Sequence, residues 1–350
     1  MFRLIKKKAV SVLAVIALIL SAAVLSSCSA EKKKPVLRAL IIPKFEEGEM
    51  SGDFPGEAQL FYEEYCAGCE ETEIPNMPDT GHFYYNEKNG VGILVTGSSK
   101  SAAGFSLITL LASDLYDYSD AYLVSVGCAG GSLGYVTLGD VVLVTAACDY
   151  DLGHHVDPRD MMDPDAAVTW FSDESFSDYE FKYMDQDLCG RVYELIKDCP
   201  LQTTEMAATV LQRNYPNWEG AYRQPAVYRG TALSGDNYWK GAYNHVTANY
   251  MAKYYGCPDP YAVSEMEEIA IANAASYYGL LDRMISLRVV VNMDVFMDTD
   301  YPENMWTANT DINQKFTEEN TETLDVFEPA MHNLFDAGRI VIDAVLDGTI

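Results

Sequence analysis

Three glutamates, Glu265, Glu267 and Glu268, lie within four positions at the start of a largely apolar segment. The next acidic or basic residue after them is Asp282. This pattern predicts a helix over 264–279 that is buried on most sides and carries its charge in its first turn. One explanation of the cluster is that carboxylates favour the positive N-terminal end of a helix, with Ser264 as the N-cap.

A second explanation concerns Glu267 in particular. In the expected helix it precedes Ile271 by one turn and Ala274 by two, so its side chain should point toward the apolar face. A carboxylate in that position needs hydrogen-bond donors, and the vicinal hydroxyls of a bound sugar are one supply. The two explanations predict different things for the rest of the chain, because only the second requires a sugar site.

The first residues indicate export. Arg3, Lys6, Lys7 and Lys8 precede an apolar run over 9–25 that ends in "LSSC", as in a bacterial lipoprotein signal. We expect residues 1–27 to be a cleaved signal peptide, Cys28 to be acylated, and 28–35 to be a tether. The protein would then be extracytoplasmic and lipid-anchored to the bacterial cell membrane. The alternative is an uncleaved membrane anchor, for which the apolar run is short.

Charge and length narrow the classes of partner and of fold. The net charge is −28, and removal of residues 1–27, with four basic and no acidic residues, would make it −32. Such a chain should be repelled by nucleic acid and by anionic lipid headgroups. No internal repeat or linker follows Pro35, so we expect one domain over 36–350.

Cysteine usage gives little evidence of a metal site. Seven cysteines follow Cys28, an odd number that leaves at least one thiol without an intramolecular partner. Cys66 and Cys69 form a C-x-x-C motif without a second pair at zinc spacing, so a local disulfide or two small helical residues explain it better. We expect no metal and no cofactor.

Buried strands and amphipathic helices alternate along the chain. Continuous apolar runs predict strands at 35–43, 90–97, 121–131, 140–150 and 283–294. Helical patterns follow at 98–117, 186–198, 203–214, 238–255, 264–279 and 322–346. The alternation predicts an α/β sandwich around a mainly parallel sheet, in which ligands bind beyond the carboxyl ends of the strands.

The strand ends carry a set of motifs that resembles a known superfamily. "VTGSSKSAAGFSLITLL", "DAYLVSVGCAGGSLGYVTLGDVVLVTAACDYD", "SEMEEIAIANAA" and "SLRVVVNMD" are similar, in order and spacing, to the core of the nucleoside phosphorylase and nucleosidase superfamily. "YDLGHHVDPRDM" and "SGDNYWKGAYNHVTANYMAKYYG" resemble segments of the purine nucleoside permease family. The resemblance implies a single-domain α/β/α sandwich with a mixed, mainly parallel sheet, and a homo-oligomer.

Two glycine-rich stretches offer backbone amides to a ligand. In "GCAGG", Cys128, Ala129 and Gly130 follow a strand and allow close approach of a hydroxyl or an anion, although such turns are common in any fold. In "GSSKSAAG", Lys100 adds charge at a helix start, which by itself is most often only a helix cap.

For the glutamate cluster, the resemblance implies that Glu267 accepts hydrogen bonds from the ribose 2′- and 3′-hydroxyls. Met266 would then lie against the sugar or the base, although a methionine is more often core filling. On the strand that follows, Arg288 and Asp294 are further candidates for ligand contact. Asp294 could equally be solvated.

The residue expected to act on the base departs from the nucleosidase pattern. Asn292 occupies the place of an aspartate that protonates the purine leaving group in similar nucleosidases. An amide can hydrogen-bond a purine but cannot donate a full proton. Phosphorylases of 6-oxopurines resembling this chain do carry asparagine there, so cleavage stays open.

The loop after the first strand is the second departure. Many similar phosphorylases bind phosphate there with glycines and an arginine, whereas this loop is acidic, has no arginine and carries four carboxylates over 46–53. These would repel phosphate unless they point away. Glu57 matches the glutamate that activates water in the nucleosidases, or is simply a glutamate in the first turn of a helix.

Two further groups of residues have competing interpretations. His154 and His155 lie among aspartates, but no zinc motif accompanies them, so a structural or ligand-lining role is favoured over a metal site. Tyr238 and Trp239 could form a stacking wall for a base. Tyrosine is frequent in this chain, 24 in all, so packing is an equally ordinary role.

Three functions compete on this reading. The first is a surface-anchored lipoprotein that binds purine nucleosides (inosine, guanosine or adenosine) and assists their uptake. The second is an extracytoplasmic phosphorylase or hydrolase that cleaves the N-glycosidic bond, with Glu57 and Asn292 as catalytic residues. The third is a surface protein that kept the fold and lost the pocket.

Overall fold

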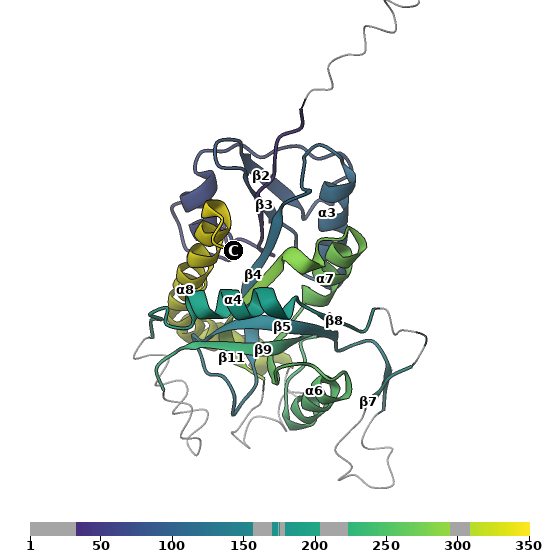
Figure 1. Ribbon diagram of the computed structural model, residues 1–350. Coiled ribbons are helices and arrows are strands. Elements are labelled where there is room, and N and C mark those ends of the chain that lie inside the picture. The colour runs from purple at the N-terminus through teal and green to yellow at the C-terminus, as the bar shows by residue number, and fades with distance from the viewer. Residues whose placement is uncertain (1–32, 157–169, 174, 176–178, 204–222, 295–308) are drawn as a thin grey trace, which may run out of the picture. The chain divides into compact units, whose positions relative to one another are not determined.

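A nine-stranded mixed sheet forms the core of the computed structural model (Figure 1). The structure describes residues 33–156, 170–173, 175, 179–203, 223–294 and 309–350, with only the backbone of 309–325. In sheet order the strands are β10 (Tyr261–Glu265), β9 (Val227–Ser234), β5 (Val141–Asp149), β11 (Met284–Met293), β4 (Tyr122–Gly131), β1 (Ala39–Ile42), β3 (Val91–Val95) and β2 (His82–Asn86), and β8 (Phe181–Tyr183) pairs with β5.

Both strand directions occur in this sheet. Five of the described pairings are parallel, among them β4 with β1 and with β11. Four are antiparallel: β2 with β3, β11 with β5, β8 with β5 and β10 with β4. The five strands predicted from continuous apolar runs are all present, because each is buried along most of its length, as an interior strand must be.

The sheet closes on itself where β10 pairs with β4. Ser264 lies opposite Gly130 and Val263 opposite Gly131. A Cβ at Gly130 would lie 2.0 Å from Asp294 Oδ1, and one at Gly131 would lie 2.7 Å from Val290 Cγ1, so no side chain fits at either position. Glycine at the end of β4 therefore allows the ends of β4, β10 and β11 to meet around one point.

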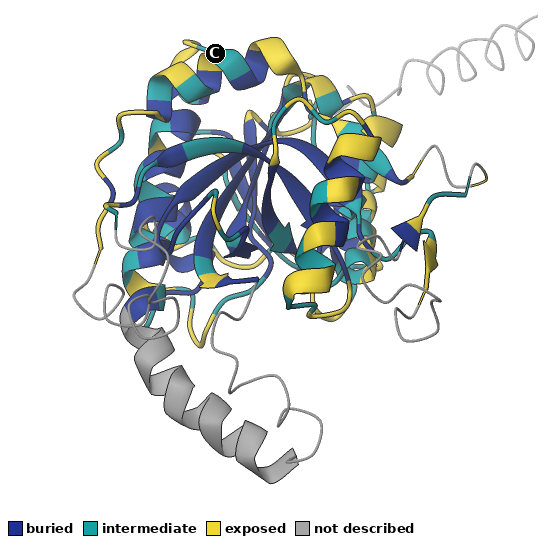
Figure 2. Cartoon of the chain, turned by 90° about the horizontal axis from the view of Figure 1, so that it is seen from below, coloured by how far each residue is buried: buried dark blue, intermediate teal, exposed yellow. Residues whose placement is uncertain are grey.

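Helices cover both sides of this sheet. They are α2 (Gln59–Phe61), α3 (Lys100–Ala112), α4 (Gln186–Ile196), α6 (Ala242–Tyr254), α7 (Glu268–Tyr277) and α8 (Asn309–Asp347), with a π-helical turn at Tyr62–Cys66 and a 3-10 turn at Leu281–Arg283. Figure 1 shows α3 packed against α7 on one side and α8 against β4 and β11 on the other. The central strands are mostly dark blue, and the helices turn their exposed residues outward (Figure 2). The predicted α/β sandwich is confirmed.

The predicted helix over 264–279 is wrong at its start. Tyr261–Glu265 is strand β10, and α7 begins only at Glu268 with Glu267 as its N-cap. Ser264 is not a cap, since its hydroxyl donates to Asp294 Oδ1. The apolar run "YAVS" pairs with β9 and β4, and these ladder hydrogen bonds decide between strand and helix.

Other features bear on the sequence predictions. Most of the helix expected at 203–214 lies outside the described residues, and β9 was not predicted. Within the part of the chain that the structure describes, no helix has the length and apolar character needed to cross a membrane. Residues 36–350 make up one compact unit. The seven cysteines after Cys28 are all free thiols.

Candidate functional site

A cavity opens where the ends of β4, β10 and β11 meet the loop after β1. Its described lining includes most of the residues singled out in the sequence: Glu57, Cys128, Ala129, Gly130, Tyr238, Trp239, Met266, Glu267, Asn292 and Asp294. Lys44, Phe45, Ser98, Asn237, Ser264, Glu265 and Val291 complete it. Segments far apart in the sequence therefore contribute to one concave site at the carboxyl ends of parallel strands, as expected for an α/β sheet.

Glu265 organises the start of α7. Its Oε2 accepts hydrogen bonds of 2.7 Å from the backbone N–H groups of both Glu267 and Glu268, and its Oε1 accepts one from Ser234 Oγ. The carboxylate thereby satisfies two of the N–H groups that a helix leaves unpaired at its start. Although Glu267 occupies the N-cap position, the side chain that caps the helix is that of Glu265. The Glu267 side chain is therefore available for another role.

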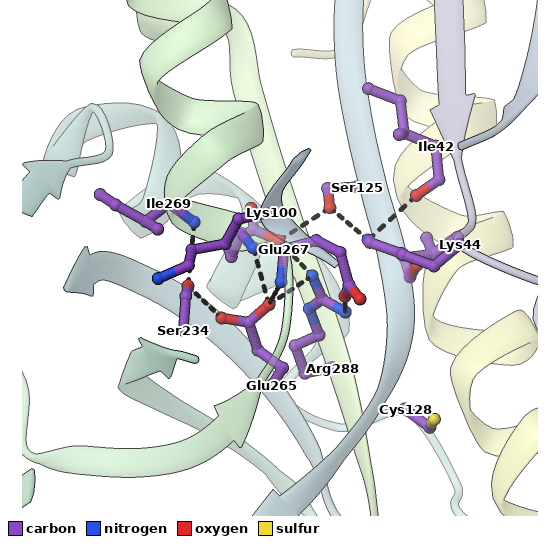
Figure 3. A network of polar contacts seen from close by, with 12 residues as sticks. Ile42, Lys44, Lys100, Ser125, Cys128, Ser234, Glu265, Glu267, Ile269 and Arg288 are labelled. Carbon is purple, nitrogen blue, oxygen red and sulfur yellow. Dashed lines mark hydrogen bonds and ion pairs between the residues drawn. The ribbon is translucent and has the colours of Figure 1, made fainter. Parts of the chain in front are cut away.

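Glu267 is a buried carboxylate at the cavity wall. Its Oε1 accepts a 3.0 Å hydrogen bond from the Ser99 N–H, and its Oε2 lies 3.9 Å from Arg288 Nη1, beyond hydrogen-bond distance. Figure 3 shows Glu267 beside Glu265 and Arg288. Burial raises the pKa of Glu267 to about 7, and the Arg288 guanidinium opposes that increase. The predicted burial is confirmed, although a cap position rather than a helical face produces it.

Behind the cavity lies an ion network that the sequence analysis missed. Arg288, fully buried, donates from Nη2 to Glu268 Oε2 at 2.6 Å and to Glu265 Oε2 at 3.1 Å. Glu268 Oε2 also accepts from Ser125 Oγ at 2.8 Å. Because the guanidinium neutralises these carboxylates, it lowers the pKa of Glu268 against the effect of burial. Arg288 thus pairs with protein carboxylates through Nη2, whereas its Nε and Nη1 groups have no hydrogen-bond partner among the described residues. It is not among the cavity-lining residues.

Lys44 extends the network to the loop after β1. Its Nζ donates to Ser125 Oγ at 2.7 Å and to the Ile42 carbonyl at 3.1 Å (Figure 3). It also donates to the Val126 carbonyl at 2.9 Å. An ammonium group has three donors, so all three are used. Burial and the charge of Arg288 lower the pKa of Lys44 to about 8. The sequence feature that could have indicated this role of Lys44 is a lysine just after the first strand, in "IIPK".

Glu57 accepts hydrogen bonds from the loop after β1 and from strand β4. Its Oε2 accepts from the Lys44 N–H and its Oε1 from the Cys128 N–H, both at 2.7 Å. These bonds hold the carboxylate in the cavity wall, where each oxygen keeps a further lone pair for a ligand or a water molecule. Glu46, in contrast, turns to the backbone N–H groups of Ala58 and Gln59. At least this carboxylate of the acidic loop points away from the cavity.

Asn292 and Asp294 also line the cavity. Asn292 is exposed to the cavity, whereas Asp294 is 1% exposed and accepts from Ser264 Oγ and from the Tyr261 hydroxyl. Burial raises the pKa of Asp294 to about 7, and those two hydrogen bonds oppose the increase. The alternative of a solvated Asp294 is wrong, because a register shift between Val290 and Asn292 and the packing of β10 enclose it.

Lys100 and the aromatic pair take different positions from those expected. Lys100 is not among the described lining residues, and its Nζ pairs with Asp149 at 2.7 Å and Asp151 at 3.0 Å. Trp239 stacks on Tyr150 with ring centroids 4.3 Å apart, and its neighbour Tyr238 is 94% exposed. Both aromatic residues line the cavity, but one face of Trp239 is already covered.

The two neighbouring histidines are not among the described cavity-lining residues. His154 and His155 form the short exposed strand β6 (His154–His155), paired with β7 (Trp170–Phe171). His154 contacts Asp173, and His155 contacts the Tyr150 carbonyl. Across the residues described, no three His, Cys, Asp or Glu side chains are grouped to hold a metal ion. Asp157 and Asp160 lie outside them.

Comparison with known proteins identifies relatives of this chain. A family model described as "Purine nucleoside permease (NUP)" matches residues 36–349. A probable purine nucleoside permease of Schizosaccharomyces pombe is 26% identical over 279 residues, which is 75% of this chain and 77% of the relative.

Solved structures share the fold at low sequence identity. The 5′-methylthioadenosine/S-adenosylhomocysteine nucleosidase of Neisseria meningitidis, in complex with methylthio-immucillin-A, has a TM-score of 0.51 and 15% identity, covering 87% of this chain and 98% of its own. The futalosine hydrolase of Helicobacter pylori has a TM-score of 0.53 and 12% identity, covering 88% and 98%. The fold is thus nucleoside phosphorylase-like.

Proposed function

Because the chain belongs to the purine nucleoside permease family, we propose that its cavity binds purine nucleosides at the outer surface of a bacterial cell. The family and the fold support a nucleoside-related function. In the proposal, Cys28 carries the lipid anchor, and the bound nucleoside is passed on for uptake. Glu267 would read the ribose, while Asn292 and Asp294 would face the base.

The observation that carries this proposal is the state of Glu267. It is a nearly buried carboxylate with one oxygen held by Ser99, and among the described residues no cation lies within hydrogen-bond distance of its second oxygen. Burying a carboxylate is costly unless donors compensate. Two vicinal hydroxyls would supply such donors, so a ribose fits this end of the cavity.

The cations near the cavity argue for an uncharged ligand. Lys44 has no donor left, and the charge of Arg288 is balanced by Glu265 and Glu268, although its Nε and Nη1 groups have no hydrogen-bond partner in the part of the chain that the structure describes. A phosphate or nucleotide would meet more carboxylates than uncommitted positive charge, whereas a neutral nucleoside has no such repulsion. Phosphate should therefore bind weakly.

One observation favours cleavage as a second candidate function. Glu57 is held in the cavity wall by two backbone N–H groups, a position from which a carboxylate can orient a water molecule. Without a proton donor at Asn292, departure of adenine would be poorly assisted. Any turnover would then be slow and would favour inosine or guanosine.

Calorimetry and product analysis together test the proposal. The purified protein is titrated with inosine, guanosine, adenosine and ribose-free hypoxanthine, with and without phosphate, and the same mixtures are chromatographed for free base. We expect nucleoside binding that exceeds base binding, with little free base and no effect of phosphate. Absence of binding would refute the proposal, and rapid phosphate-dependent base release would establish a phosphorylase instead.

A further inference from the structure

Two cysteines face each other near the carboxyl end of β5. Cys148 is the next-to-last residue of that strand, and Cys257 follows α6 by three positions. Their Sγ atoms are 3.5 Å apart, although the residues are separated by 109 positions in the sequence. Cys148 is fully buried, whereas Cys257 is only partly buried.

We propose that Cys148 and Cys257 are a disulfide site, oxidised by exchange with an external disulfide. A disulfide bond is about 2.05 Å long, so the two sulfur atoms need to approach by only about 1.5 Å. Both thiols belong to or pack against one apolar cluster that includes Tyr255 and Trp170. Since neither side chain has to leave this cluster, the bond forms within the existing packing.

The two thiols differ in a way that sets the order of the exchange. The hydrogen bond from Cys148 lowers the pKa of Cys257, whereas burial raises the pKa of Cys148. The partly exposed Cys257 thiolate therefore attacks the external disulfide RSSR, which forms a mixed disulfide and releases RS⁻. Cys148 then attacks the Cys257 sulfur and displaces the second RS⁻. Two protein thiols lose two electrons, and the oxidant leaves as two RSH with their protons.

The bond would fasten helix α6, which follows the cavity-lining residues Asn237, Tyr238 and Trp239. Helix α6 contacts β10 and packs through Ala248, Met251 and Ala252 in a cluster separate from the main core. The residues before α6 include Trp239, which stacks on Tyr150, two positions after Cys148. The disulfide thus joins the far end of α6 to the strand that supports the aromatic wall.

The oxidation test uses the full-length protein and oxidised glutathione. The protein is purified with reductant, freed of it, incubated with oxidised glutathione and blocked with N-ethylmaleimide. Peptides from a digest without reduction are then mapped by mass spectrometry. We expect a peptide pair joined through Cys148 and Cys257, and an increase in Tm of about 5 °C that dithiothreitol reverses.

Variants separate this site from other thiol chemistry. Cys257→Ser should give neither the linked peptides nor the increase in Tm, whereas the matched variant Cys199→Ser should give both. Absence of the linked peptide pair from the oxidised wild-type protein overturns the proposal, including the case in which glutathione merely stays attached to Cys257. The peptide map decides even if a variant does not fold. It is also independent of nucleoside binding and of export, so failure of either leaves this test intact.

Discussion

Replacing Glu267 with glutamine tests whether this carboxylate reads the sugar. The change keeps the size of the side chain, and the amide oxygen can still accept the Ser99 N–H. What is lost is charge on the oxygen that is not held by Ser99. One charge-assisted hydrogen bond is worth about 1.5 to 3 kcal/mol, so the Kd for inosine should increase by roughly 10- to 150-fold.

The assay is calorimetry at pH 8, because the pKa of Glu267 is about 7 and the carboxylate is then mostly ionised. Binding of hypoxanthine, which has no ribose, should change little. Glu87→Gln, at an exposed turn between β2 and β3, is the matched control and should bind both ligands as the wild type does. Equal losses for inosine and hypoxanthine would refute the assignment of Glu267 to the sugar.

The same pKa predicts a proton linkage. Bound hydroxyls stabilise the ionised form of Glu267, so inosine should bind more tightly as the pH increases through about 7, and binding below that pH should release a proton. Titrations in buffers of different ionisation enthalpy measure this proton. The release should be smaller in Glu267→Gln, and an unchanged release in that variant would assign it to another group.

Three other changes give distinct expected results. Asn292→Asp should increase adenosine hydrolysis, measured as free adenine, and no increase would argue that the cavity lacks the rest of a nucleosidase site. In the folded protein the buried Asp294 carboxyl, with its pKa raised from 3.8 to about 7, holds a proton that the unfolded chain has already released. The free energy of unfolding of the wild type therefore falls as the pH increases from about 4 to 7. Asp294→Asn removes this group and should make that fall smaller. Denaturant midpoints at pH 5 and pH 8 measure this, and equal pH dependence in both proteins would contradict it. Cys28→Ala should remove the protein from the membrane fraction or block signal cleavage, whereas a cleaved protein that stays on the membrane would disprove the lipid anchor.

The sheet was largely predictable because its central strands need to be apolar on both faces. The strands β1, β3, β4, β5 and β11 stand out for that reason as continuous apolar runs. Strand β9 was missed because "VYRGTALS" mixes polar and apolar residues. A short apolar run such as "YAVS" has no periodicity that distinguishes strand from helix, so β10 was merged with the helix that follows.

The residues that line the cavity were predictable from the sequence, whereas the ion network behind the cavity was not. Motifs after the strands indicated Glu57, Glu267 and Asn292, all of which line the cavity. The pairing of Glu268 with Lys44 through Ser125 was not readable, because it depends on three segments that only the closed sheet brings together. Sequence spacing conveys which residues share a helix or strand, but not which distant charges neutralise each other.

The buried ion network bears directly on the choice between nucleoside binding and phosphorolysis. Around the inner wall lie two cations and four carboxylates: Lys44, Arg288, Glu57, Glu265, Glu267 and Glu268. An anionic co-substrate would add a negative charge to this set, and Lys44 has no unused N–H group to receive it, although the Nε and Nη1 groups of Arg288 have no hydrogen-bond partner within the described ranges. Burying a further charge that the existing cations do not neutralise costs several kcal/mol. A neutral nucleoside adds no charge, since its hydroxyls donate to carboxylates already in place. The arrangement of charge therefore supports the binding of an intact nucleoside over its cleavage by phosphate.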